Sequence, residues 1–241
     1  ITIDRPSKHN ALARSVLAGL ADAVEAAGTS GHAKVIVLTG AGERFFAAGG
    51  DLLDLASVRD EAATLLMTDE ARQSLDTLRR CPIPVIAYLN GDAIGGGAEL
   101  ALACDMRLQA SHARIGFVQA RLAITSAWGG GPDLCRLVGG PTAMRMMSRC
   151  ELVNAPQALA LGLADAVITQ GAAEGELLAF LEPMLACPPQ VLRGIKAQTL
   201  AWRCGESYEA SRAIEQKELM KTWLHDDHWS ASENLLSKGK K

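Results

Sequence analysis

The sequence predicts an α/β protein whose chain ends in a run of helices, and three observations support this. Lys34–Thr39 (KVIVLT) and Pro84–Leu89 (PVIAYL) are short apolar runs without alternation, which is typical of strands covered on both faces. Stretches of helical periodicity separate these runs. Beyond Ile168 the pattern is helical alone. The order strand–helix–strand therefore favours strands joined by crossover helices.

In the first half of the chain, each expected element has its own local signal. Ile1–Ile3 has the character of a strand, and Ser15–Ala27 places four apolar side chains on one helical stripe. A polar helix is expected over about Asp60–Arg80. Gly95–Ala103 runs from a glycine-rich loop into a helix, and Met106–Ala110 follows as a strand.

The second half is dominated by closely spaced helices. Asn154 is a preferred N-cap residue for the third of them, and Gly162 ends that helix. A last strand is expected at Ala164–Ile168. The predicted helices are Gly130–Val138, Thr142–Cys150, Ala155–Leu161, Ala173–Ala186, Gln190–Ala201 and Tyr208–Trp223.

Three tryptophans, Trp202, Trp223 and Trp229, lie in the helical tail. Large apolar residues most often belong to a core, which is the first interpretation. The alternative is that this tail docks onto a partner subunit.

Composition excludes some functions. The 241 residues include 24 Lys and Arg against 27 Asp and Glu, a net charge of −3, so the basic excess of a nucleic-acid-binding protein is missing. The one basic cluster, Lys238, Lys240 and Lys241, is interpreted as a solvated tail, with a phosphate contact as the alternative. No apolar run reaches 18 residues, so no membrane span or membrane partner is expected.

Cysteine and histidine spacing predicts no metal site. The six cysteines never approach C-x-x-C spacing and are expected to be buried, reduced thiols, and the five histidines are scattered. The chain begins at Ile1, within an expected strand, so a targeting segment upstream is left open. A cytoplasmic protein is expected, with a mitochondrial location as the alternative.

The loop Phe46–Asp51 consists almost wholly of small residues. A backbone that approaches a ligand closely with free N–H groups needs this composition, although a plain tight turn has it too. Asp51 is expected to cap the segment that follows.

The loop Gly91–Glu99 opens a helix with three glycines, Gly95, Gly96 and Gly97. Unpaired N–H groups at a helix N-terminus favour an anionic oxygen. The spacing fits neither the Rossmann nor the P-loop motif. Glu99 lies in the first turn among apolar neighbours, where burial would raise its pKa toward values useful for proton transfer; the alternative is a charge that simply favours the helix N-terminus.

Taken together, these segments resemble the enoyl-CoA hydratase/isomerase (crotonase) family. Four blocks fall in the family's order and spacing, over nearly the whole chain: RPSKHNAL (5–12), VIVLTGAGERFFAAGGDL (35–52), PVIAYLNGDAIGGGAELALACDMRL (84–108) and APQALALGLADAVI (155–168).

The resemblance implies a spiral of ββα units over residues 1–170, carrying a site for a CoA thioester. It implies a helical trimerisation region over 171–241 and assembly as a homotrimer or a dimer of trimers. The substrate would be an acyl-CoA thioester of fatty acid metabolism, with coenzyme A as part of the substrate and no separate cofactor.

The resemblance also assigns the site residues. The N–H groups of Gly50 and Gly96 would form an oxyanion hole for a thioester enolate, and Glu99 matches one of the two glutamates that hydratases use. The adenine would lie near Ala48 and Gly49. Further CoA or substrate contacts are expected from Asp51, Leu52, Gly95 and Trp128.

The sequence departs from the hydratases at their second glutamate, where it has Gln119. A neutral amide cannot act as the second carboxylate in hydration. The segments 117–131 and 228–241 look most like the ethylmalonyl-CoA decarboxylase branch of the family. Loss of CO2 needs an enolate site and one proton donor, so decarboxylation of methyl- or ethylmalonyl-CoA is the leading hypothesis. Trp128 would form a dry apolar wall, or would be a core residue only.

Two alternatives remain open at this point. An enoyl-CoA hydratase or isomerase using Glu99 alone is the first, because isomerisation needs one base. A non-catalytic CoA-binding protein is the second. Arg114 and Arg121 are not assigned to substrate or to surface.

Overall fold

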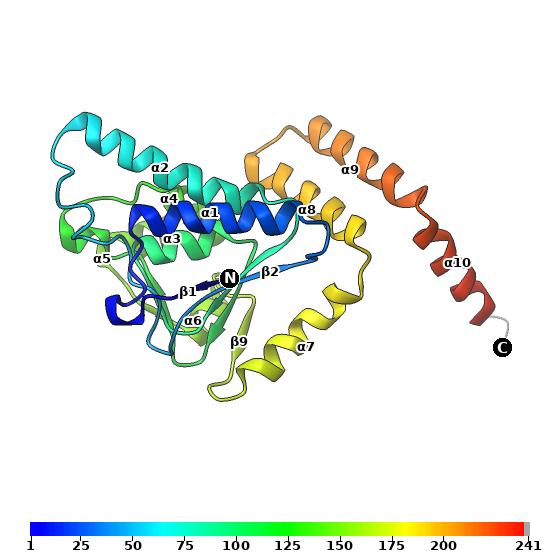
Figure 1. The fold of residues 1–241 in the computed structure, drawn as a ribbon, viewed down its shortest axis with the longest axis horizontal. Helices are drawn as coiled ribbons and strands as arrows, with labels where there is room; N and C mark the ends of the chain where they lie inside the picture. The colour runs from blue at the N-terminus through cyan, green and yellow to red at the C-terminus, as the bar shows by residue number, and fades with distance from the viewer. Residues whose placement is uncertain (239–241) are drawn as a thin grey trace.

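The computed structural model describes residues 1–238. Two small sheets and their covering helices form a body, from which the last two helices project (Figure 1). Lys240 and Lys241, two of the three basic residues of the predicted solvated tail, lie outside the described residues.

The larger sheet has five strands in the order β1-β2-β4-β6-β9, and every pairing is parallel. This confirms the crossover topology. In β4 four of the five residues are buried, as a strand covered on both faces requires. The strands are β1 (Thr2–Ile3), β2 (Ile36–Gly40), β4 (Val85–Leu89), β6 (Met106–Ala110) and β9 (Ala166–Ile168).

A second, four-stranded sheet was not predicted. Its strands have two or three residues each, too few to display a period of two, and three of them closely follow a strand of the first sheet. The chain thus runs β2, β3, α2 and then β4, β5, α3, which is the repeated ββα unit that the resemblance implies. The order is β3 (Phe45–Ala47), β5 (Asp92–Ile94), β7 (Arg114–Gly116) and β8 (Val153–Asn154).

The helices of the body agree with the predicted ranges. α1 (Arg14–Thr29) packs against α2 (Glu61–Arg80), whose N-cap Asp60 accepts a hydrogen bond from Ala63 N at 2.8 Å. All eight residues of α3 (Gly96–Ala103) are buried. The N-cap predicted at Asn154 is confirmed, and the structure adds a capping box with Gln157. The remaining short helices are η1 (Pro6–Lys8), η2 (Gln119–Leu122), α4 (Gly130–Val138), α5 (Gly140–Arg149) and α6 (Ala155–Ala160).

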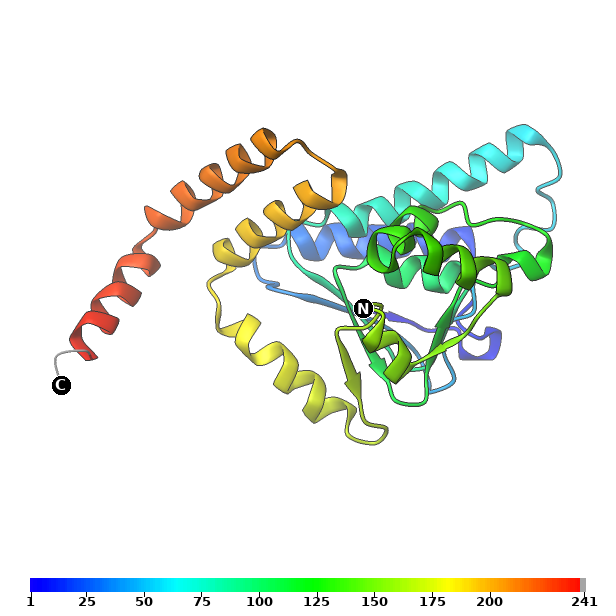
Figure 2. The same cartoon turned by 180° about the vertical axis from the view of Figure 1, so that it is seen from behind.

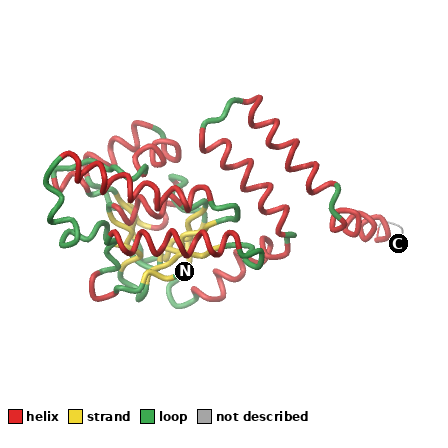
Figure 3. The backbone as a smooth tube through the Cα atoms, turned by 45° about the horizontal axis from the view of Figure 1, so that its top comes forward, coloured by secondary structure: helices red, strands yellow, loops and turns green. Residues whose placement is uncertain are grey.

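The C-terminal helices form an arm. Seen from behind in Figure 2 and with the top turned forward in Figure 3, α9 and α10 extend away from the sheets, and α9 lies beside α8. The tryptophans of this arm are exposed, Trp202 by 69%, so the interpretation as core residues of this chain is wrong. The arm's helices are α7 (Ala173–Ala186), α8 (Pro189–Cys204), α9 (Tyr208–Trp223) and α10 (Asp226–Lys238).

All six cysteines are free thiols, but only Cys81, Cys104 and Cys150 are buried. Cys135 and Cys204 lie on solvent-facing sides of helices, so the prediction of burial is wrong there, and Cys187 is half-buried. Within residues 1–238, no helix has both the length and the apolar character to cross a bilayer, and no cluster of three or more potential ligand side chains is placed to hold a metal ion.

Candidate active site

The first glycine loop leaves β3 and runs beside the second. Gly49 has φ +100°, and a Cβ there would lie 3.1 Å from Ile94 O and 3.3 Å from Gly96 N. Leu12 fixes the loop from the other side, because its N–H donates to Gly49 O at 2.8 Å and its carbonyl accepts from Asp51 N at 3.2 Å. The close approach of the two loops therefore requires glycine.

Asp51 ends this loop, with its carboxylate turned to the protein. It accepts from Leu53 N at 3.2 Å, which confirms the predicted cap. Arg5 pairs with it at 2.9 Å, and this hydrogen bond is the main cause of a lowered Asp51 pKa. Leu52, by contrast, is 62% exposed at the surface.

The second loop begins α3. Gly95 has φ +58° and donates its N–H to Gly116 O at 2.9 Å, so its own donor is used. A Cβ on Gly97 would overlap Ala47 O, the carbonyl at the end of β3. The glycine run is thus the place where the two ββα units touch.

Gly50 and Gly96 present the backbone donors of this site. Among the hydrogen bonds of residues 1–238, none uses the N–H of either glycine as a donor. Gly96 is also the first residue of α3, where the helix dipole favours negative charge. Two free N–H groups on adjacent loops suit an anionic oxygen; their role as an oxyanion hole stays a prediction.

Trp128 packs over both glycines. A Cβ on Gly50 would lie 3.5 Å from Trp128 Cη2 and 3.1 Å from Leu55 Cδ1, and a Cβ on Gly96 would overlap Trp128 Cζ3. The indole is 7% exposed. Trp128 therefore belongs to the core and is at the same time an apolar wall beside the two donors.

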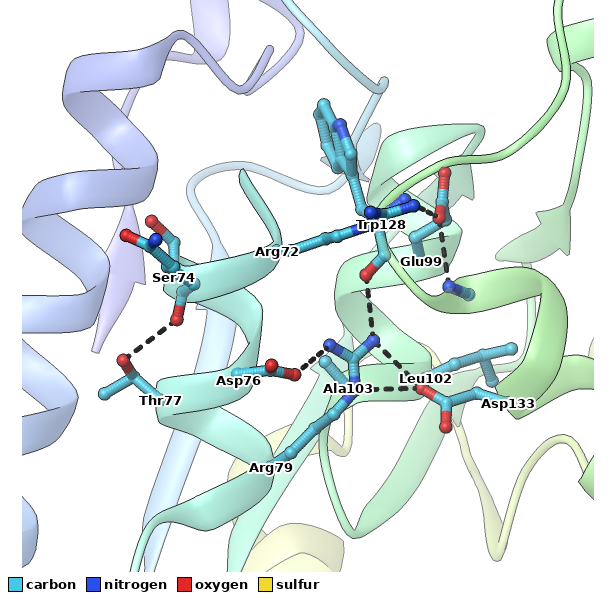
Figure 4. Close-up of polar contacts among 12 residues, drawn as sticks. Arg72, Ser74, Asp76, Thr77, Arg79, Glu99, Leu102, Ala103, Trp128 and Asp133 are labelled. Atoms are coloured by element: carbon cyan, nitrogen blue, oxygen red, sulfur yellow. Dashed lines mark hydrogen bonds and ion pairs between the residues drawn. The ribbon is translucent and has the colours of Figure 1, made fainter. Parts of the chain in front are cut away.

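The Glu99 side chain contacts the backbone of Trp128, and the residue is 2% exposed. Its Oε2 accepts from Trp128 N at 2.8 Å (Figure 4). The same oxygen accepts from Gly130 N at 3.0 Å, and Oε1 accepts from Gln119 Nε2 at 2.9 Å. Burial raises the pKa of Glu99, and these hydrogen bonds oppose the rise in part. The expected desolvation and the upward pKa shift are confirmed.

Gly130, predicted only as the first residue of a helix, and Gly129 before it also shape the site. A Cβ on Gly130 would overlap Glu99 Cγ, so the carboxyl fits only against glycine. Gly129 has φ +92°, which turns the chain into α4. The signal was present as three glycines before a helical segment, but nothing local showed that Glu99 faces it.

The two unassigned arginines are held by the protein. Arg114 pairs with Asp92 at 2.6 Å, and Arg121 Nη2 donates to Cys150 O at 3.1 Å. Arg114 lies in β7 of the second sheet and Arg121 lies in η2, and each makes its contact within the protein at the surface.

Comparison with known proteins agrees with this geometry. A sequence profile of the enoyl-CoA hydratase/isomerase family matches residues 1–240. The ethylmalonyl-CoA decarboxylase of Xenopus tropicalis is 30% identical over 245 residues, covering 100% of this chain and 79% of that protein. The 2,3-dehydroadipyl-CoA hydratase of Escherichia coli is 36% identical over 214 residues, covering 87% and 82%.

Solved structures give the same result. An enoyl-CoA hydratase from Bacillus anthracis superposes with a TM-score of 0.91 and 27% identity, covering 98% of this chain and 91% of that one. One from Geobacillus kaustophilus superposes with a TM-score of 0.89 and 31% identity, covering 97% and 89%.

Proposed function

The chain belongs to the enoyl-CoA hydratase/isomerase family and is an acyl-CoA-processing enzyme of the crotonase type; from this premise we propose that it decarboxylates a short malonyl-type CoA thioester. Methyl- and ethylmalonyl-CoA are the proposed substrates. The observation that carries the proposal is the partner of Glu99: a neutral amide, Gln119, lies 2.9 Å from it, where the hydratases' second glutamate is expected.

The proposed reaction uses backbone donors and one acid. The bond between the α-carbon and the substrate's carboxylate breaks, CO2 leaves, and the electron pair forms the thioester enolate. The N–H groups of Gly50 and Gly96 bind the enolate oxygen, each contributing about 3 kcal/mol to the stabilisation of the transition state. Glu99 then gives its proton to the α-carbon and recovers one from water.

The surroundings of Glu99 support its role as the acid. A carboxylate has about four acceptor positions. Oε2 uses two of them and Oε1 uses one for the contacts with residues of the described chain, which leaves one position for a proton. The upward pKa shift from burial favours the protonated form at a given pH.

Gln119 and Trp128 favour decarboxylation over hydration. A second carboxylate about 4 Å from the substrate's own would cost about 4 kcal/mol at an effective dielectric near 20, and a glutamine avoids this repulsion. The indole of Trp128 beside both donors excludes water from the enolate.

A turnover assay with methylmalonyl-, ethylmalonyl- and crotonyl-CoA tests the proposal. We expect CO2 release from one or both malonyl thioesters and little hydration of crotonyl-CoA. Hydration of crotonyl-CoA without any CO2 release would favour the second candidate, an enoyl-CoA hydratase or isomerase using Glu99 alone. The similarity to the hydratase of Escherichia coli is the observation in favour of that candidate.

We also propose that the arm packs on further copies of this chain, in a trimer or a dimer of trimers. Its exposed apolar side chains support this: Trp202, Trp223, Leu224, Trp229, Leu235 and Leu236. Light scattering should give three or six times the chain mass of 25.4 kDa. A monomer mass at micromolar concentration would contradict it.

A further inference from the structure

The segment that binds Glu99 is also contacted by a partly buried arginine that the proposed reaction does not use. Arg79 is in the last turn of α2, and its side chain is 12% exposed. Its guanidinium donates three hydrogen bonds: Nε to Asp133 Oδ2 at 3.0 Å, Nη1 to Asp76 Oδ1 at 2.9 Å, and Nη2 to Trp128 O at 3.1 Å (Figure 4).

Trp128 is therefore held from two sides. Its carbonyl accepts from Arg79, while its N–H donates to Glu99. Two turns earlier on α2, Arg72 Nε donates to Ala127 O at 2.7 Å, and that carbonyl belongs to the same peptide unit as the Trp128 N–H. Arginines of α2 thus fix consecutive carbonyls of the segment whose N–H groups face the carboxyl.

Asp133 fixes Arg79 in turn. Asp133 is 5% exposed, and its carboxylate also accepts from Arg203 Nη2 at 2.8 Å. Arg203 donates further to Leu102 O and Ala103 O, the last turn of the helix that carries Glu99. A carboxylate shared by two guanidinium groups has little freedom to move, because each fork requires a fixed geometry. The network thus holds both α3 and the start of α4.

We propose that Arg79 is a positioning residue for Glu99: by bridging Asp133 and the Trp128 carbonyl, it fixes the segment whose Trp128 and Gly130 N–H groups bind the carboxyl. The importance of this for turnover rests on the proposed role of Glu99 as the acid. The positioning itself is measurable without turnover.

If the contacts of Arg79 are lost, the acidity of Glu99 should change. Hydrogen bonds from Trp128 N and Gly130 N stabilise its ionised form and oppose the effect of burial. When the segment loosens, these bonds weaken and the pKa of Glu99 rises further. Because a misplaced acid affects the chemical step, kcat should fall by roughly tenfold with KM little changed.

The experiment is a titration of Glu99 by ¹³C NMR in protein labelled at the glutamate carboxyl carbons, with Glu99→Gln assigning the resonance. In Arg79→Gln we expect the Glu99 pKa to rise by about one pH unit. Arg79→Lys keeps the charge but not the fork of three directed bonds, so most of the rise should persist. Arg136→Gln is the matched control. Arg136 pairs with Asp133 at 3.7 Å from an exposed position, so this substitution removes the same charge without removing a contact to Trp128. In this variant Glu99 should titrate as in the wild type.

Two results would overturn the proposal: a wild-type pKa of Glu99 in Arg79→Lys, which would leave charge alone as the cause, or an equal rise in Arg136→Gln. If circular dichroism shows that Arg79→Gln does not fold, Arg79→Lys decides alone. A wild-type enzyme without decarboxylase activity would refute the proposed function, whereas the titration would still test Arg79.

Discussion

The two walls of the site are built differently. One wall consists of the glycine loops around Gly50 and Gly96, where the backbone supplies the donors and a Cβ would separate the loops. The second wall is the segment 117–130, which offers the side chains of Gln119 and Trp128 and holds Glu99. Backbone donors stabilise any thioester enolate, whereas side chains decide how the enolate forms and where its proton goes. In the proposed reaction, the first wall thus carries the chemistry that stabilises the enolate, and the second wall selects which reaction takes place.

The largest effect is expected from the first wall. In Gly97→Ala the new Cβ overlaps Ala47 O, which forces the loops apart and misplaces both donors. We expect turnover of every CoA thioester to fall by about 10⁴-fold, since each lost donor costs about 10²–10³. The melting temperature should fall as well. Gly19→Ala in α1, whose Cβ meets no atom within 4 Å, is the control and should keep full activity. A wild-type kcat in Gly97→Ala would refute this division of the site.

Glu99→Gln tests the proposed acid, which lies on the helix that begins in the first wall and is bound by the second wall. Loss of general acid catalysis should lower kcat by about 10²–10⁴-fold. Substrate affinity should change little, because the amide keeps the size of the carboxyl. Steady-state kinetics with the best thioester measure both. Unchanged turnover would remove Glu99 from the mechanism and would favour a role in structure only.

The second wall should change the kind of reaction more than its rate. Gln119→Glu places a second carboxyl beside Glu99, which supplies the base missing for hydration and repels a malonyl carboxylate. We expect hydration of crotonyl-CoA to rise by about tenfold and decarboxylation to fall. Gln119→Met, which is neutral and similar in length, should not gain hydration. Hydration at background in Gln119→Glu would show that Gln119 is not the decisive difference.

The pH dependence of kcat and of the free energy of unfolding tests the proposed role of Glu99. In the proposed reaction Glu99 acts while protonated, so kcat should fall as the pH rises through its pKa, which burial places above the ordinary 4.5. Because the folded-state pKa is raised, the contribution of Glu99 to stability is complete below its unfolded pKa and is lost as the pH rises through the folded one. Urea unfolding should therefore show Glu99→Gln gaining stability relative to the wild type from about pH 4 to about pH 8. An equal difference at both pH values would contradict the raised pKa.

The smallest effect is expected for Trp128→Phe. The smaller ring leaves a gap beside Gly50 and Gly96, which should lower the free energy of unfolding by about 1–2 kcal/mol and change the rate only a few-fold. Urea unfolding and the ratio of hydration to decarboxylation measure the two effects. A loss of activity as large as that of Glu99→Gln would mean that the indole takes part in the reaction.

The sequence alone predicted the features that have a local cause. The bounds of α4, α7, α9 and β6 match the expected ranges, because the residues that indicate each of these elements lie within the element itself. The composition of the glycine loops and the cap by Asp51 are local in the same sense. The four short strands of the second sheet were missed, since their pairing is between distant segments and their length gives no period.

The tertiary structure decided what distant segments do to one another. No local pattern shows that Gly130 and Trp128, about 30 residues after Glu99, hold its carboxyl, or that Arg79 holds Trp128 from α2. It also showed that the tryptophans of the arm lie outside the core of this chain. Residue types and local spacing determine which donors and acids are present, whereas burial, hydrogen-bond partners and hence the pKa of Glu99 depend on long-range packing.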